Sequence, residues 1–184
     1  GNQTIAVASA GTWYFKSEAI NNVGNGTLSS AVTVATPSVP APSTVSLTID
    51  NPDPSPFTVT IELVPASDGG SSITGYNLFV SPDDSTYTQI GTNIVANQTT
   101  TVANAGTWYF KSQAINNVGT GNNGTAVTVA TPTVPPAPAS ATSVIPNIDT
   151  APYTVTVSWD LPASTGGSAL TSYTVYRQTG TGTF

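Results

Sequence analysis

The sequence contains no cysteine and no histidine. Without cysteine, the chain has no disulfides, thiolate nucleophiles or cysteine-based zinc sites. Without histidine, it lacks the usual general base and the usual imidazole metal ligand, which excludes Ser-His-Asp and Cys-His catalytic sites. We therefore predict a chain that is not an enzyme, with no cofactor and no catalytic, cofactor-binding or metal-binding residue.

Charge is also scarce, at 7% of residues against about 25% in ordinary soluble domains. Lys16, Lys111 and Arg177 are the only Lys and Arg residues, and the formal net charge is −6. Three cations cannot neutralise a row of phosphates. We therefore predict no nucleic-acid partner. No apolar run approaches the roughly 18 residues of a membrane-spanning helix, so we predict no direct membrane insertion by this segment.

What the chain does contain is a repeat. AGTWYFKSEAINNVGNG begins at Ala10, and AGTWYFKSQAINNVGTG begins at Ala105, an offset of 95 residues. FTVTIELVPASDGGSSITGY from Phe57 is answered by YTVTVSWDLPASTGGSALTSY from Tyr153, with an offset of 96 that becomes 97 after one insertion. About 95 residues is the length of one small β-sandwich domain, so the chain is predicted to be a tandem array.

The phase of the repeats predicts one complete unit, 41–132, between two partial ones. Residues 1–36 are the C-terminal part of one repeat, and residues 138–184 are the N-terminal part of a further repeat. ATPSVPAPS and ATPTVPPAPAS lie between the units, and their prolines fix φ and remove donors. We expect stiff, extended linkers and a semi-rigid rod.

Period-two alternation of apolar and polar residues dominates the units. Phe57, Val59 and Ile61 alternate with Thr58 and Thr60, the pattern of a strand with one dry and one wet face. About seven such short segments fall in one period, with Gly or Pro turns and no helical pattern of useful length. We predict an all-β chain of tandem antiparallel β-sandwiches.

Aromatic residues on the dry faces of these strands are predicted to form the core. They are Trp13, Trp108, Trp159, Tyr76 and Tyr173, and Tyr173 shares its predicted strand with Val175. Tyr14 and Tyr109 point the other way, where they could stack on a sugar or on a neighbouring subunit.

The blocks resemble fibronectin type III repeats. The late-strand pattern of that family, an aromatic residue, alternating apolar positions and then A-x-N-x-x-G-x-G, is matched by Trp108, Phe110, Ala114, Asn116, Gly119 and Gly121, and again 95 residues earlier. The second-strand tryptophan is matched by Trp159, and the third-strand tyrosine by Tyr76 and Tyr173. The resemblance implies a fibronectin type III-like sandwich in every unit.

The chain departs from the family in three places. Trp13 and Trp108 stand where the family has the tyrosine of its corner motif, so an indole N–H must replace the phenolic hydrogen bond or the bond is lost. Leu63 stands where the middle unit should have its tryptophan, and no RGD tripeptide occurs. The GGS-x-x-T-x-Y segment resembles bacterial, phage or environmental extracellular versions of the repeat.

Acidic residues offer two further interpretations. Asp83 and Asp84 in SPDDS are predicted to form a turn, because Asp accepts hydrogen bonds from nearby backbone N–H groups. Asp50 and Asp53 with loop carbonyls are an alternative, weak calcium site, since that ion needs only oxygen ligands.

Four N-x-T sequons make Asn2, Asn25, Asn97 and Asn123 candidate N-glycosylation sites. We pair Asn2 with Asn97, and Asn25 with Asn123, as equivalent positions of the repeat. We hypothesise sugars at Asn97 and Asn123.

The two ends of the chain nearly complete one another, since Phe184 corresponds to Tyr87 and Asn2 to Asn97. We therefore predict either an excerpt of a longer tandem array or strands supplied by a neighbouring chain. The predicted function is a noncatalytic extracellular or cell-surface stalk or filament subunit, a glycoprotein that acts as spacer and adhesive scaffold. Its predicted partners are copies of itself and glycans. The alternatives are a virion fibre or decoration protein, and a spacer or glycan-binding module of a secreted carbohydrate-active enzyme.

Overall fold

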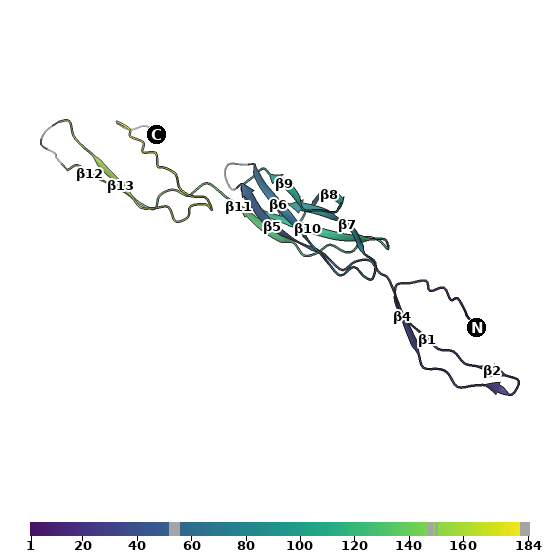
Figure 1. Cartoon of the computed structure of the whole chain (residues 1–184). Helices are drawn as coiled ribbons and strands as arrows, with labels where there is room; N and C mark the ends of the chain where they lie inside the picture. The colour runs from purple at the N-terminus through teal and green to yellow at the C-terminus, as the bar shows by residue number, and fades with distance from the viewer. Residues whose placement is uncertain (52–55, 147–148, 150, 181–184) are drawn as a thin grey trace.

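The computed structural model describes residues 1–51, 56–146, 149 and 151–180. Every regular element in these residues is a β-strand, so the prediction of an all-β chain is confirmed. Figure 1 shows an elongated molecule in which a central sandwich lies between two smaller β parts at its opposite ends. We call residues 1–36 the head and residues 138–180 the tail. The described residues contain no apolar helix of the length that crossing a bilayer requires.

The central sandwich has a three-stranded and a four-stranded antiparallel sheet. The first has the order β5-β6-β9, and the second the order β11-β10-β7-β8. This three-on-four strand order is that of a fibronectin type III-like sandwich. The bounds are β5 Thr44–Asn51, β6 Phe57–Val64, β7 Ile73–Ser81, β8 Thr88–Ile94, β9 Gln98–Val102, β10 Gly106–Asn116 and β11 Val127–Thr131.

The core of this sandwich follows from the alternation in the sequence. In β6, Phe57, Val59 and Ile61 are buried, while the residues between them are only half-buried. They pack with Leu78 of β7 and Phe110 of β10, which come from the opposite sheet. The period of two therefore placed the dry face of β6 correctly.

The head contains the hairpin of β1, Gly11–Phe15, and β4, Val32–Thr36, beside two short strands, β2 Ile20–Asn21 and β3 Gly24–Asn25. Trp13 pairs with Val34 in this hairpin, as Trp108 pairs with Val129 in the central sandwich. Every paired position of β1 and β4 recurs 95 residues later in β10 and β11. The duplicated sequence therefore folds into the same hairpin with the same register.

The tail contains one antiparallel pair, β12 Ala141–Val144 with β13 Thr156–Trp159. The strand predicted around Tyr173 and Val175 is wrong as a strand, because this segment has no ladder partner in the described chain. Its central counterpart, β7, lies between β10 and β8, and the tail has no equivalent of either strand. A strand needs a neighbour to pair with, so local sequence alone was insufficient here.

Candidate functional site

The acidic residues that the structure describes are not clustered in a way suited to metal binding. No group of three or more Asp, Glu, His or Cys residues among them could hold a metal ion. Asp50, one half of the alternative calcium site, accepts a hydrogen bond from the Thr60 hydroxyl, and Asp53 lies outside the described residues.

The acidic segment 81–87 is a hydrogen-bonded turn. Asp83 Oδ1 accepts from the backbone N–H groups of Ser85, at 2.9 Å, and Thr86, at 3.0 Å, and from the Ser81 hydroxyl at 2.8 Å. These bonds, that from Thr86 foremost, hold the pKa of Asp83 well below its ordinary value because they favour the carboxylate. Asp83 therefore has the turn-forming geometry that its sequence context suggested.

Asp84 belongs to a surface cluster that joins this turn to β10. It accepts a hydrogen bond from the Tyr87 hydroxyl, which is the main reason that the pKa of Asp84 is lowered. Lys111 Nζ lies 3.4 Å from Asp84 Oδ1 and 4.0 Å from the centre of the Tyr87 ring. Lys111 and Asp84 therefore form an ion pair at the surface, and Tyr87 contacts both of them.

The aromatic residues predicted for the core occupy different environments. Tyr76 is buried, and Trp13 and Trp108 are partly buried on the inner faces of their hairpins. Trp159 and Tyr173, by contrast, are 36% and 38% exposed. They contact each other, with ring centroids 5.3 Å apart, but the tail offers them no opposite sheet.

The two hairpin tryptophans also replace the family's tyrosine corner. Trp108 Nε1 donates to the carbonyl oxygen of Asn104 at 3.0 Å, and Trp13 Nε1 donates to that of Ser9 at 3.2 Å. Both bonds reach four residues back along the chain. The indole N–H thus takes over the role of the phenolic O–H.

All four sequon asparagines are exposed. Asn97 Oδ1 accepts from the Leu63 N–H at 3.1 Å, and Asn25 Nδ2 donates to Glu18 Oε1 at 3.1 Å. Our pairing of Asn25 with Asn123 is wrong. The bond from Gly26 N to Ala19 O recurs from Gly121 N to Ala114 O, so Asn25 is equivalent to Thr120.

The strongest candidate for a functional site is the pair of junctions between the units. At the first, the Ser38 N–H of the linker donates to the Gly69 carbonyl at 2.8 Å. At the second, the Thr133 N–H donates to the Gly166 carbonyl, also at 2.8 Å. The proline-rich linker therefore binds the Gly-rich loop of the following unit in the same way twice.

Glycine is required at both junctions. Gly69 and Gly166 have φ values of 68° and 73°, which other residues rarely adopt. A Cβ at Gly69 would lie 2.5 Å from the Ser38 carbonyl oxygen, and one at Gly166 would lie closer still to the Thr133 carbonyl oxygen. The linkers can approach these loops only because no side chain intervenes.

A third segment ties the first junction together. Asn116, at the end of β10 and 4% exposed, donates through Nδ2 to the carbonyl oxygens of Ser38, at 2.7 Å, and Asp68, at 2.8 Å. Its Oδ1 accepts from the N–H groups of Val118 and Gly119. One carboxamide thus joins strand, linker and loop. The Asn of the A-x-N pattern recurs in the sequence, but its contacts with the linker and the loop were not predicted from that pattern.

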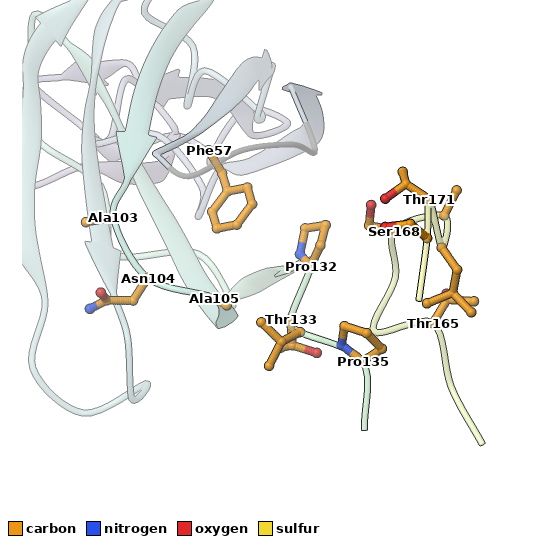
Figure 2. A pocket seen from close by; sticks show the side chains of 14 residues that line it. Phe57, Ala103, Asn104, Ala105, Pro132, Thr133, Pro135, Thr165, Ser168 and Thr171 are labelled. Atoms are coloured by element: carbon orange, nitrogen blue, oxygen red, sulfur yellow. The ribbon is translucent and has the colours of Figure 1, made fainter. Parts of the chain in front are cut away.

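A cavity of about 530 Å³ lies at the second junction. Figure 2 shows Phe57 of the central unit on one side, Pro132, Thr133 and Pro135 of the linker, and Thr165 of the tail loop. None of its described lining residues is titratable. The described lining of this cavity therefore offers no acid, base or cation.

The comparisons with known proteins concern the fold. No protein-family model matches the sequence, and no curated protein matches it. The chain is similar to a crystal structure of titin domains, with 24% identity and a TM-score of 0.44 over 66% of this chain and 41% of that one. It is also similar to the 6th fibronectin type III domain from human fibronectin type III domain containing protein 3, with 19% identity and a TM-score of 0.43 over 58% of this chain and 95% of that one.

A further similarity is to the chicken CNTN1 FN1-FN3 domains, with 14% identity and a TM-score of 0.36 over 66% of this chain and 41% of that one. The chain thus spans less than half the length of the titin and CNTN1 structures. At these TM-scores the likeness carries no argument about function. The fibronectin type III-like description rests on the strand order of the central sandwich.

Proposed function

We propose that this chain is a noncatalytic structural repeat protein that acts as an extracellular or cell-surface spacer, as part of a stalk or filament. The observation that carries the proposal is the recurrence of one linker-to-loop hydrogen bond at both junctions. A spacer needs joints that hold successive units in a fixed relation, and a repeated short contact between proline and glycine segments provides such joints.

The composition of the surface also supports the proposal of a noncatalytic spacer. The chain has few charges and no described cluster of reactive groups, so its polar surface consists mainly of hydroxyl and amide side chains. Asn97 and Asn123 stay our predicted glycosylation sites. Sugars there would be tested by the intact mass of protein from its native source, and a mass equal to that of the polypeptide alone would contradict them.

The joint is tested by Gly69→Ala together with Gly166→Ala, measured by small-angle X-ray scattering at a concentration low enough to keep the chain monomeric. We expect the linker to detach, so that the distribution of interdomain distances broadens while the far-ultraviolet circular dichroism stays unchanged. A narrow, unchanged distribution would contradict the proposal.

The matched control is Gly70→Ala together with Gly167→Ala. These neighbours have φ values of 83° and 91°, so the substitution introduces similar backbone strain. A Cβ at either position meets the linker only at 3.7 to 3.8 Å, which is ordinary contact. The control should therefore leave the joint closed.

A further inference from the structure

We infer that one face of the four-stranded sheet binds a neutral polysaccharide. This inference goes beyond the spacer role and does not rest on it, because the face belongs wholly to the central sandwich. Its residues come from three adjacent strands, β8, β7 and β10. We call the following set the outer face: Asn77, Phe79, Gln89, Tyr109, Lys111 and Gln113.

The register of the sheet places these side chains together. Lys111 pairs with Phe79, which pairs in turn with Gln89, so three strands contribute neighbouring residues to one row. Gln113 and Asn77 pair in the next row on the same side of the sheet. Residues that face each other across an antiparallel pair have Cβ atoms about 5 Å apart, so the two rows form one continuous surface.

Phe79 and Tyr109 are aromatic residues that the core does not use. Leu78 and Val80, on either side of Phe79, pack in the core, and so do the residues on either side of Tyr109. Because side chains alternate along a strand, Phe79 and Tyr109 point away from the core, and both are half-buried. Neighbouring residues thus hold part of each ring, while the rest stays accessible. A ligand that stacks on such a ring orders little that is not already ordered.

The sheet also orients two amide side chains of the outer face. Gln113 Oε1 accepts from Asn77 Nδ2 at 3.4 Å, and Gln113 Nε2 has no acceptor among the described residues. Gln89 Nε2 donates to the Gly91 carbonyl at 3.1 Å and to the Thr92 hydroxyl at 3.0 Å, while Gln89 Oε1 accepts nothing from the described chain. The face therefore offers one oriented donor and one oriented acceptor. A sugar hydroxyl both donates and accepts, so it matches either group.

The charge of the outer face favours a neutral ligand. The chain has a formal net charge of −6, but the only charged residue of this face is Lys111, whose Nζ lies 3.4 Å from Asp84 Oδ1. Because this pair is balanced, neither an anionic nor a cationic partner finds an unpaired opposite charge. Taking a charge out of water without such a partner is costly, whereas sugar hydroxyls exchange their water for the amides at little cost. Aromatic rings with a few placed polar groups are typical of such binding sites.

The open shape of a sheet favours a polymer over a single sugar. A sheet face contacts only one side of its ligand, so one sugar ring makes few contacts there. Tyr109 and Gln113 are four residues apart on β10, which corresponds to about 13 Å along the strand. A polysaccharide can contact both residues at once, with successive sugars on the ring and on the amide.

The test is isothermal titration calorimetry of the 184-residue chain with neutral hexasaccharides. The probes are cellohexaose, xylohexaose, mannohexaose and laminarihexaose, and the hexamer of galacturonic acid is the charged comparison. We expect at least one neutral probe to bind, and the galacturonate hexamer to bind at least tenfold more weakly. Tyr109→Ala should weaken binding at least tenfold, and Gln113→Ala about fivefold, since the first removes a stacking ring and the second one hydrogen-bond donor.

Matched controls change the same residue types elsewhere. Tyr14 occupies the position of Tyr109 in the duplicated hairpin, but β1 has only β4 beside it in the described chain, so Tyr14→Ala should bind like the unmodified protein. Gln98 lies on β9 of the other sheet, so Gln98→Ala should also bind normally. Tyr109→Phe keeps the ring and should retain the affinity. Circular dichroism must show every variant folded, and Gln113→Ala carries the test if Tyr109→Ala does not fold.

Four results would overturn the inference. They are no binding of any neutral probe, binding of the galacturonate hexamer as tight as that of the neutral probes, normal binding by the folded outer-face variants, and an equal loss in the controls. Self-association that Tyr109→Ala abolishes, measured by sedimentation without sugar, would also overturn it, because the face would then belong to a second copy. None of these results concerns the joints, so the spacer proposal would stand.

Discussion

The hairpin of the head and its twin in the central sandwich have nearly the same sequence and the same register, but different burial. Phe110 is fully buried, whereas its equivalent Phe15 is only partly covered. Asn116 is buried, and its equivalent Asn21 is exposed. In this duplicated hairpin, local sequence therefore determines strand pairing, and the opposite sheet determines what becomes core.

The largest difference between the two hairpins is expected when Phe110 and its equivalent Phe15 are each replaced by alanine. Phe110→Ala should lower the free energy of unfolding of the central sandwich by about 3 to 5 kcal/mol, because it removes a large side chain and leaves a cavity. Phe15→Ala should leave that free energy unchanged in the monomer. Urea denaturation at low protein concentration measures both, and equal losses would contradict the comparison.

The next largest effect concerns a buried pair of hydroxyls. Ser112 Oγ lies 2.8 Å from Ser43 Oγ, and both side chains are buried. Ser112→Ala leaves the Ser43 hydroxyl without its partner and should cost about 1 to 3 kcal/mol. Ser17, the exposed equivalent of Ser112, should tolerate the same substitution within about 0.5 kcal/mol. A destabilising Ser17→Ala would show that the head is packed in solution.

A smaller effect is expected for the indole hydrogen bond, which both hairpins share. Trp108→Phe removes the donor to the Asn104 carbonyl and should cost about 0.5 to 1.5 kcal/mol in the unfolding of the central sandwich. Trp13→Phe removes the same bond in the head and should not change that transition. Hydrogen exchange of the 104–108 and 9–13 segments would show whether each corner loosens locally.

The smallest expected effect on stability comes from Asp83 in the acidic turn. The equivalent residue in the tail is Gly180, which has no carboxylate. The folded state lowers the pKa of Asp83 below its ordinary value of 3.8, so its contribution to stability is present above that value and is lost as pH falls. Asp83→Asn should therefore reduce stability slightly at neutral pH and flatten its decline below about pH 4. Acid titration followed by NMR checks this, and an unshifted Asp83 carboxyl would contradict it.

Alternation in the sequence predicted the strands and dry faces of the central sandwich, because alternation is a local property. The segment around Tyr173 alternates in the same way but forms no strand, because the described tail lacks its pairing partners. The sequence also predicted that an indole could replace the phenol of the corner, because the motif fixes that position. It could not predict that Trp159 and Tyr173 stay exposed, since burial depends on a second sheet. The contacts of Asn116 escaped prediction because they join carbonyls 78 and 48 residues away, which only the folded chain brings together.

The first strand pair of the central sandwich and that of the tail differ in the sizes of the side chains at one paired position. Val45 faces Leu63 in the central unit, whereas Ala141 faces Trp159 in the tail. A mistaken pairing of β5 with β13 would bring two large side chains together, and one of β12 with β6 would leave a void. Either error is penalised by packing. The two strand pairs can thus discriminate their own partner from the neighbouring one while the chain folds, which limits misassembly between them.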